Sequence, residues 1–346
     1  MNRASWSLQK WLIGIFCIAS VLVTGWFNAH KPRLVILQSY DKSYSWTKDV
    51  NIGINRILDA HRDYSINWYY LDTKRHPWTE FKTNAGQAMR RMLHASPPDV
   101  LLAVDDDAQQ YVTRHLLNHP TIRIVFSGVN NPPEDYGFDK ADNVTGILER
   151  KPWAALLETL LILAEYNNLK TPLTIQFLGD QSDSVIADEI DFREFDMAPI
   201  QVVDSRLVNT FAEWKQALEE SRGKVDFLIT TNYRKIKRSE GSNDLMPPKE
   251  LIDWSEQHSP TPLIGTNAFY AEDGGMLAIG TSPYEQGEVA ANMVVEMLSN
   301  DKTPKQLPMR GTEQFVVAVR SKLLAARNLK LPKVYESAAR AINKYY

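Results

Sequence analysis

Cysteine is almost absent from this chain of 346 residues, whose single cysteine is Cys17. Cys17 lies inside an apolar stretch near the start of the sequence, so the rest of the chain, called the body below, contains none. This excludes disulfide bonds, thiol catalysis and thiolate metal sites from the body. A body of this size without disulfides is typical of a large protein that needs no covalent cross-links.

Signature motifs of common enzymes are missing as well. The sequence contains no GxGxxG, no phosphate loop ending in GK[ST], no GxSxG and no HExxH. His115 and His119 have the spacing of two metal ligands on a helix, but no third ligand accompanies them and Pro120 follows directly. We therefore expect no enzyme activity, no catalytic residue, no metal and no cofactor.

The charge balance gives no sign of a nucleic-acid partner. The formal net charge is -3, and 23% of the residues are charged. The basic run from Arg234 to Arg238 is isolated, and no aromatic platform accompanies it. A chain of this length exceeds what one hydrophobic core usually supports, so two lobes are expected.

The first residues are typical of export. Arg3 and Lys10 precede Trp11 to Phe27, which carry no charge. This apolar run is long for a signal peptide and short for a membrane span. Residues 1–29 are therefore predicted to be a signal peptide or an N-terminal membrane anchor. Either one places the body in the periplasm or another extracytoplasmic space, and bulky Phe16 argues against lipidation of Cys17.

Apolar runs alternate with helical spacing along the body. Leu34 to Leu37 reads as a buried strand, and a helical pattern begins at Thr47. The alternation continues to Phe126 and starts again at Trp153, which predicts an α/β fold of two Rossmann-like lobes with parallel sheets. Further strand patterns at 275–280 and 314–319 predict a three-strand hinge. The expected lobes are 30–148 plus about 268–300, and 149–267 plus about 301–346.

Polar and aromatic residues follow the predicted strands, at the sheet edge where ligands bind in open α/β sheets. For the three aspartates from Asp105, capping of the next helix is an alternative interpretation. Gly128 fits either a simple turn or a close approach of the backbone to a ligand. The candidate ligand-binding residues are Ser39, Tyr40, Tyr44, Trp46, Asp105, Asp106, Ser127, Gly128, Asp180, Ser182, Thr231, Asn232, Asn267 and Tyr284.

Several stretches together resemble the type I periplasmic binding proteins, in particular the ABC-transporter substrate-binding family with tryptophan-binding members. These stretches are VILQSYDKSYSW, DVLLAV, IVFSGV, FLITTN, PLIGTNAFYAEDGGMLAIGTSPYEQGEVAANMVVEML and GTEQFVVAVRSKLLAARNLKLP. The likeness covers about residues 33–332. The chain differs at DDDAQQ, where small residues often follow the third strand of the family. The resemblance implies reversible binding of a small solute by closure of two lobes about a hinge.

Three functions follow as hypotheses. The first is a binding protein that presents an amino acid, an aromatic compound or a similar small solute to an ABC permease. The second is a binding module that signals to a membrane histidine kinase or cyclase, which a retained anchor would favour. The third is an enzyme on an α/β scaffold, which would turn over a bound small molecule.

Overall fold

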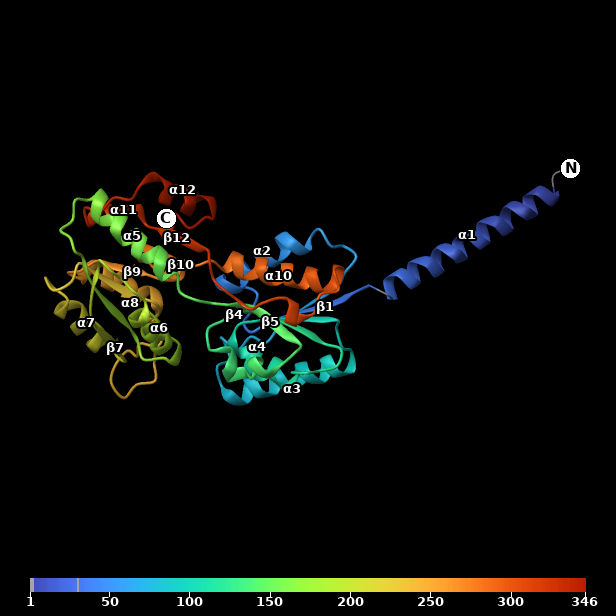
Figure 1. Ribbon diagram of the computed structural model, residues 1–346, viewed down its shortest axis with the longest axis horizontal. Helices are drawn as coiled ribbons and strands as arrows, with labels where there is room; N and C mark the ends of the chain where they lie inside the picture. The colour runs from blue at the N-terminus through green and yellow to red at the C-terminus, as the bar shows by residue number, and fades with distance from the viewer. Residues whose placement is uncertain (1–2, 30) are drawn as a thin grey trace.

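The computed structural model describes residues 3–29 and 31–346, and it begins with a helix that lies apart from the body. Helix α1 (Arg3–Ala29) extends away from the first lobe (Figure 1). Its stretch Lys10–Asn28 is long and apolar enough to cross a membrane, and none of that stretch is buried. Cys17 is exposed on this helix.

The first lobe is built on a six-stranded sheet, counted within residues 31–346. All of its neighbouring strands run parallel. Its order is β11 (Arg310–Gly311), β5 (Val144–Leu148), β4 (Arg123–Val129), β3 (Val100–Val104), β1 (Arg33–Gln38) and β2 (Ser65–Tyr70). Strand β3 and the inner part of β1 are apolar without interruption, because helices cover both faces of the sheet.

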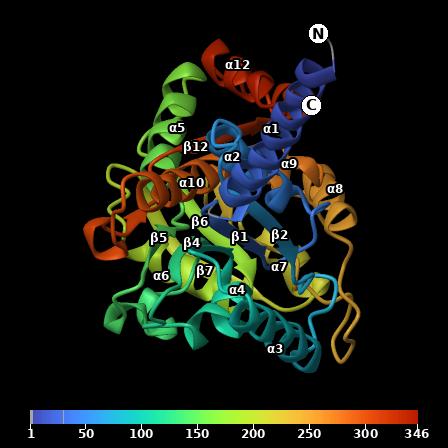
Figure 2. The same cartoon turned by 90° about the vertical axis from the view of Figure 1, so that its right-hand side faces the viewer.

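Helices cover both faces of this sheet. Helices α2 (Ser45–Leu58) and α10 (Pro283–Ser299) pack together on one face, and α3 (Thr79–Ala95) and α4 (Asp106–Tyr111) lie on the other (Figure 2). Gly53 and Gly287 allow the close contact of α2 and α10, because a Cβ atom at either would meet the other helix's backbone at 2.2 Å. Short 3₁₀ turns lie at Thr113–His115, Pro133–Tyr136, Phe138–Lys140 and Pro304–Gln306.

The second lobe, within the same described range, also has a six-stranded sheet. Its strand β12 runs antiparallel to β10, and its other pairs are parallel. The order is β12 (Phe315–Val319), β10 (Leu277–Thr281), β9 (Leu263–Gly265), β8 (Phe227–Thr230), β6 (Thr174–Asp180) and β7 (Gln201–Val208). The helices are α5 (Trp153–Tyr166), α6 (Asp183–Glu194), α7 (Phe211–Glu220), α8 (Pro248–His258), α9 (Phe269–Glu272), α11 (Ser321–Ala326) and α12 (Lys333–Ala341).

Within residues 31–346 the chain passes between the two sheets three times. The crossings follow β5, β10 and β11. This confirms the α/β class, the two lobes and the three-strand hinge. The boundaries differ from the expected ones, however. Residues 268–281 belong with the second sheet, and β11 belongs with the first. A strand's own sequence does not reveal which sheet it will join, because its neighbours in the sheet come from distant parts of the chain.

Candidate functional site

Two adjoining cavities lie where the carboxyl ends of both sheets meet. One has a volume of about 360 Å³ and is lined by Asp49, Glu272 and Lys344 among others; we call it the Lys344 cavity. The other has a volume of about 280 Å³ and is lined by Asp105, Glu149 and Asp188 among others; we call it the Asp105 cavity. Side chains from both lobes form the wall that they share: Tyr44, Trp46, Lys74, Arg234, Asn267 and Phe269.

The loop after β1 places aromatic rings in the middle of this region. Tyr40 and Tyr44 pack edge to face with their ring centroids 5.4 Å apart. The ammonium of Lys74, in the loop after β2, lies 4.8 Å and 5.5 Å from these two centroids. Burial, followed by the charge of Asp105, raises the pKa of Tyr40 well above its ordinary value, so its hydroxyl stays neutral. The loop therefore offers flat apolar surface beside the Lys74 ammonium.

Asp105 is the most unusual side chain of the site. Its backbone has φ 66° and ψ 164°, a conformation found almost only for glycine. Its side chain is buried, and Oδ1 accepts a hydrogen bond of 3.1 Å from the Trp46 indole N–H. Oδ2 has no hydrogen-bond partner among the described residues. Burial, reinforced by Glu149 and Asp106, raises the pKa of this carboxyl well above its usual range.

Neighbouring groups hold Asp105 in this position. Its N–H donates to the carbonyl of Ser127 at 2.8 Å. A Cβ atom on Gly128 would lie 3.1 Å from Asp105 Oδ1, and Gly128 has φ +65°. Only glycine meets both conditions without strain. Gly128 therefore makes room for the Asp105 carboxylate.

The other aspartates after β3 do not cap helix α4. Asp106 accepts hydrogen bonds from the Tyr136 hydroxyl at 2.7 Å and from Asn130. Asp107 pairs with Lys82. Ser39 does the capping instead, because its Oγ accepts a hydrogen bond of 2.8 Å from the Ala108 N–H. The capping interpretation of the three aspartates is therefore wrong.

A buried ion network joins the first crossing to the second lobe. The Lys151 ammonium lies 3.0 Å from Glu149 Oε1 and 3.9 Å from Asp188 Oδ2 on α6. Burial lowers the pKa of Lys151, but the two carboxylates outweigh it and the pKa rises to about 12. Burial raises the pKa of Asp188 to about 6, although Lys151 acts in the opposite direction. Lys151 thus remains charged where it lines the Asp105 cavity.

The second lobe contributes a mainly polar wall. Asn267 donates to the Thr231 carbonyl at 2.9 Å. Arg234 pairs with Asp273 at 2.6 Å, and its guanidinium carbon lies 4.4 Å from the centroid of Phe269. Arg234 therefore presents a fixed cation and a stacked ring to the cleft.

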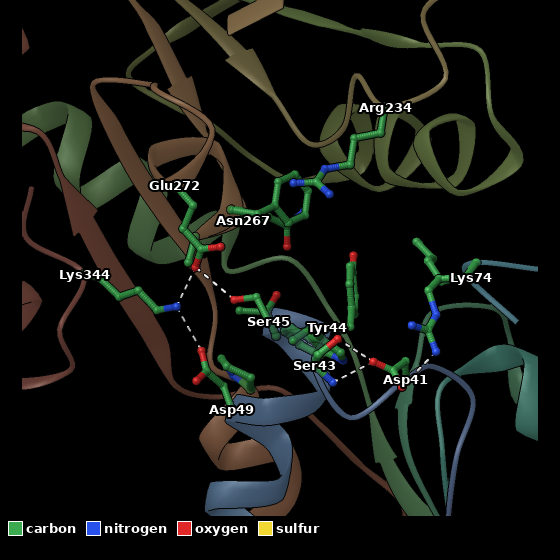
Figure 3. A pocket seen from close by; sticks show the side chains of 16 residues that line it. Asp41, Ser43, Tyr44, Ser45, Asp49, Lys74, Arg234, Asn267, Glu272 and Lys344 are labelled. Atoms are coloured by element: carbon green, nitrogen blue, oxygen red, sulfur yellow. Dashed lines mark hydrogen bonds and ion pairs between the residues drawn. The ribbon is translucent and has the colours of Figure 1, made fainter. Parts of the chain in front are cut away.

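Charged groups from both lobes meet in the Lys344 cavity. Figure 3 shows the side chains of Lys344, Glu272 and Asp49 pointing toward one another. Lys344 Nζ lies 3.0 Å from Asp49 Oδ2 and 2.5 Å from Glu272 Oε1. The Ser45 hydroxyl also donates to Glu272 Oε1 at 3.1 Å.

The structure brings nine of the predicted residues to the cavities and places five elsewhere. The nine are Tyr40, Tyr44, Trp46, Asp105, Asp106, Ser182, Thr231, Asn232 and Asn267. The five that do not line either cavity are Ser39, Ser127, Gly128, Asp180 and Tyr284.

These five residues already make contacts inside the protein, and Ser39 does so through the bond to the Ala108 N–H described above. Ser127 Oγ donates to the Gln286 carbonyl at 3.0 Å, and the Gly128 N–H donates to Gln286 Oε1 at 2.8 Å. Asp180 accepts from the Ser182 and Lys235 N–H groups. Tyr284 stacks under Arg56. These residues support the site instead of lining it, because a strand-end position does not tell which way a side chain points.

Several lining residues were not among the predictions: Lys74, Glu149, Lys151, Asp188, Glu272 and Lys344. The strand-end rule could have found Lys74, which follows β2. The strand-end rule could not have found Lys344, because this residue follows helix α12 and not a strand. Across the described residues, no group of three or more His, Cys, Asp or Glu side chains could hold a metal ion.

Comparison with known proteins gives the fold. No family model matches the sequence, and no curated protein matches it. A ligand-free, open substrate-binding protein with adhesive properties from Clostridium difficile has 17% identity and a TM-score of 0.67, covering 87% of this chain and 96% of that one. An ABC domain in complex with L-Trp from Streptococcus pneumonia has 17% identity and a TM-score of 0.60, covering 89% and 98%.

A periplasmic ribose ABC transporter protein from Conexibacter woesei also matches, with 13% identity and a TM-score of 0.54, covering 86% of this chain and 95% of that one. At these identities the likeness establishes the architecture alone. The chain has the two-lobed fold of the type I periplasmic binding proteins.

Proposed function

We propose that this chain is an extracytoplasmic binding protein that captures a small solute between its two lobes. Three features support this function: two α/β lobes, three crossings between them, and cavities lined from both sides at the junction. A ligand that touches both walls stabilises the arrangement in which the walls are close. Binding then becomes a change in the relative position of the lobes.

The observation that carries the proposal is the unpaired Oδ2 of Asp105. A buried carboxylate oxygen without a partner is costly in the ligand-free protein, and a ligand that donates a hydrogen bond removes that cost. Trp46 holds the other oxygen, and the ring of Tyr40 lines the same cavity. We infer a ligand that carries an ammonium or hydroxyl group next to a flat or apolar portion.

Binding without covalent chemistry is part of the proposal. Other charged side chains around the cavities already have partners inside the protein, as Asp106 has in Tyr136 and Lys151 has in Glu149. No signature of an activated nucleophile occurs in the sequence. The partner that reads the lobe closure is a membrane permease of the ABC type. The membrane-length helix α1 favours the second candidate, a sensory module that stays beside a membrane signalling protein.

Native mass spectrometry of the detergent-purified chain tests the binding function first, because a co-purified solute would be identified by its mass. A panel of aromatic amines, aromatic amino acids and sugars is then compared by thermal unfolding. Ligand at 100 times its Kd adds about 2.7 kcal/mol to the free energy of unfolding.

Asp105→Asn is the matched variant, because it keeps the shape of the side chain and the acceptor for Trp46. We expect it to lose the thermal shift given by the amines. If no member of the panel shifts the wild type, the inferred ligand class is wrong. If the purified protein converts a member of the panel, the non-enzymatic assignment is wrong.

A further inference from the structure

Lys344 belongs to a segment that is attached to the second lobe. The Val319 N–H on β12 donates to the Lys344 carbonyl at 2.9 Å, and the Tyr346 N–H donates back to the Val319 carbonyl at 2.8 Å. These bonds attach the segment after α12 to the outer edge of the second sheet. These backbone hydrogen bonds fix the position of the Lys344 backbone relative to the second sheet.

The end of the same side chain reaches the other lobe. Its ammonium contacts Asp49 on α2, and α2 packs against α10 in the first lobe. It also contacts Glu272 on α9, within its own lobe. Glu272 in turn accepts from Ser45, which begins α2. Two polar contacts therefore cross the junction within this one cluster.

Burial separates this pair from ordinary surface ion pairs. The side chains of Lys344 and Asp49 are only 10% and 11% exposed. Ion pairs at the surface contribute little because water and salt screen them, whereas a buried pair is screened much less. Separation of the lobes would divide the cluster and leave Asp49 without the cation.

We propose that Lys344 is a built-in bridge that holds the two lobes together before any ligand arrives. Its ammonium takes the place that a lobe-bridging ligand would take, with one carboxylate partner in each lobe. Because Lys344 also lines the cavity, the strength of this bridge sets how often the cleft opens to admit solute. This role concerns the ligand-free protein and does not depend on which solute is bound.

The test measures the distance between the lobes in the full chain without ligand. Spin labels are placed at Glu80→Cys on α3 and Ala212→Cys on α7, both exposed, in a Cys17→Ser background. Pulsed dipolar spectroscopy then compares this protein with Lys344→Met, which removes the charge and keeps most of the unbranched side chain. We expect the ratio of separated to closed arrangements to rise about tenfold, as for a coupled ion pair.

Two further variants isolate the bridge. Asp49→Asn removes the partner in the first lobe and should shift the distances in the same direction, and the double variant should shift them no further. Lys249→Met is the matched control, because it breaks an exposed pair with Asp253 inside one helix of the second lobe. It should leave the distances unchanged.

If Lys344→Met and Asp49→Asn both retain the wild-type distance distribution, the bridge does not exist. An equal shift in Lys249→Met would also overturn it, because the effect would then be general. Should Lys344→Met fail to fold, Asp49→Asn alone decides the question. A ligand-free measurement keeps this result separate from the ligand class proposed above.

Discussion

Asp105→Gly is expected to make the ligand-free protein more stable and to abolish binding. Asp105 combines a backbone conformation that suits glycine with a buried, unpaired carboxylate oxygen. Relief of the backbone strain contributes about 1–3 kcal/mol. The lost hydrogen bond from Trp46 costs about 0.5–1.5 kcal/mol. The greater freedom of glycine in the unfolded chain costs about 0.5–1 kcal/mol. These terms nearly cancel, so the sign depends on the carboxylate charge.

The charge of the Asp105 carboxylate makes the stability gained by Asp105→Gly depend on pH. Burial raises the pKa of Asp105 above its value in the unfolded chain, so the folded protein holds this proton more tightly. The wild type therefore loses stability as the pH rises from the unfolded pKa, about 3.9, through the higher folded pKa. Asp105→Gly does not suffer this loss. Its advantage over the wild type should be close to zero near pH 4 and positive at pH 7.

Urea unfolding of both proteins at the two pH values measures this difference. Asp72→Gly is the control, because Asp72 also has a positive φ, 59°, but its carboxylate is paired with Arg75. Asp72→Gly should show no gain that grows with pH. If Asp105→Gly is less stable than the wild type at pH 7, or if its advantage is the same at both pH values, the assignment of Asp105 as a strained binding group is refuted.

Three further predictions follow from the same contacts. Affinity for an amine ligand should increase as the pH rises through the raised pKa of Asp105, because the cation binds the ionised carboxylate. Calorimetry in two buffers should detect the release of a proton on binding, and a pH-independent affinity would contradict this prediction. Gly128→Ala should lower the free energy of unfolding by about 1–2 kcal/mol, since a left-handed backbone disfavours a Cβ atom; an unchanged urea midpoint would show that no such strain exists. Lys151→Met should lower the free energy of unfolding by about 3–5 kcal/mol, because it leaves Glu149 and Asp188 buried without their cation. Since the pKa of Asp188 is about 6, urea unfolding should show a larger loss of stability at pH 8 than at pH 5, and the reverse order would exclude this network.

Local patterns in the sequence were sufficient for the α/β class and the two lobes. The apolar run Leu34 to Leu37 forms β1, and the helical spacing after Thr47 forms α2. Such patterns predict elements because a strand or helix must bury its own apolar face wherever it packs. The strand-end rule also located nine lining residues, including Trp46 and Asp105, because the carboxyl ends of parallel strands share one edge of the sheet.

Only the tertiary structure decided which lobe an element joins and which way a side chain points. Residues 268–281 joined the second sheet, and Ser39 turned inward to cap α4. The ion pair between Asp49 and Lys344 joins residues that lie almost 300 positions apart in the sequence. No local pattern encodes such a contact, because it depends on how two separately folded lobes meet. The sequence by itself thus determined the elements and the edge where they converge, whereas packing between the lobes determined the contacts of the site.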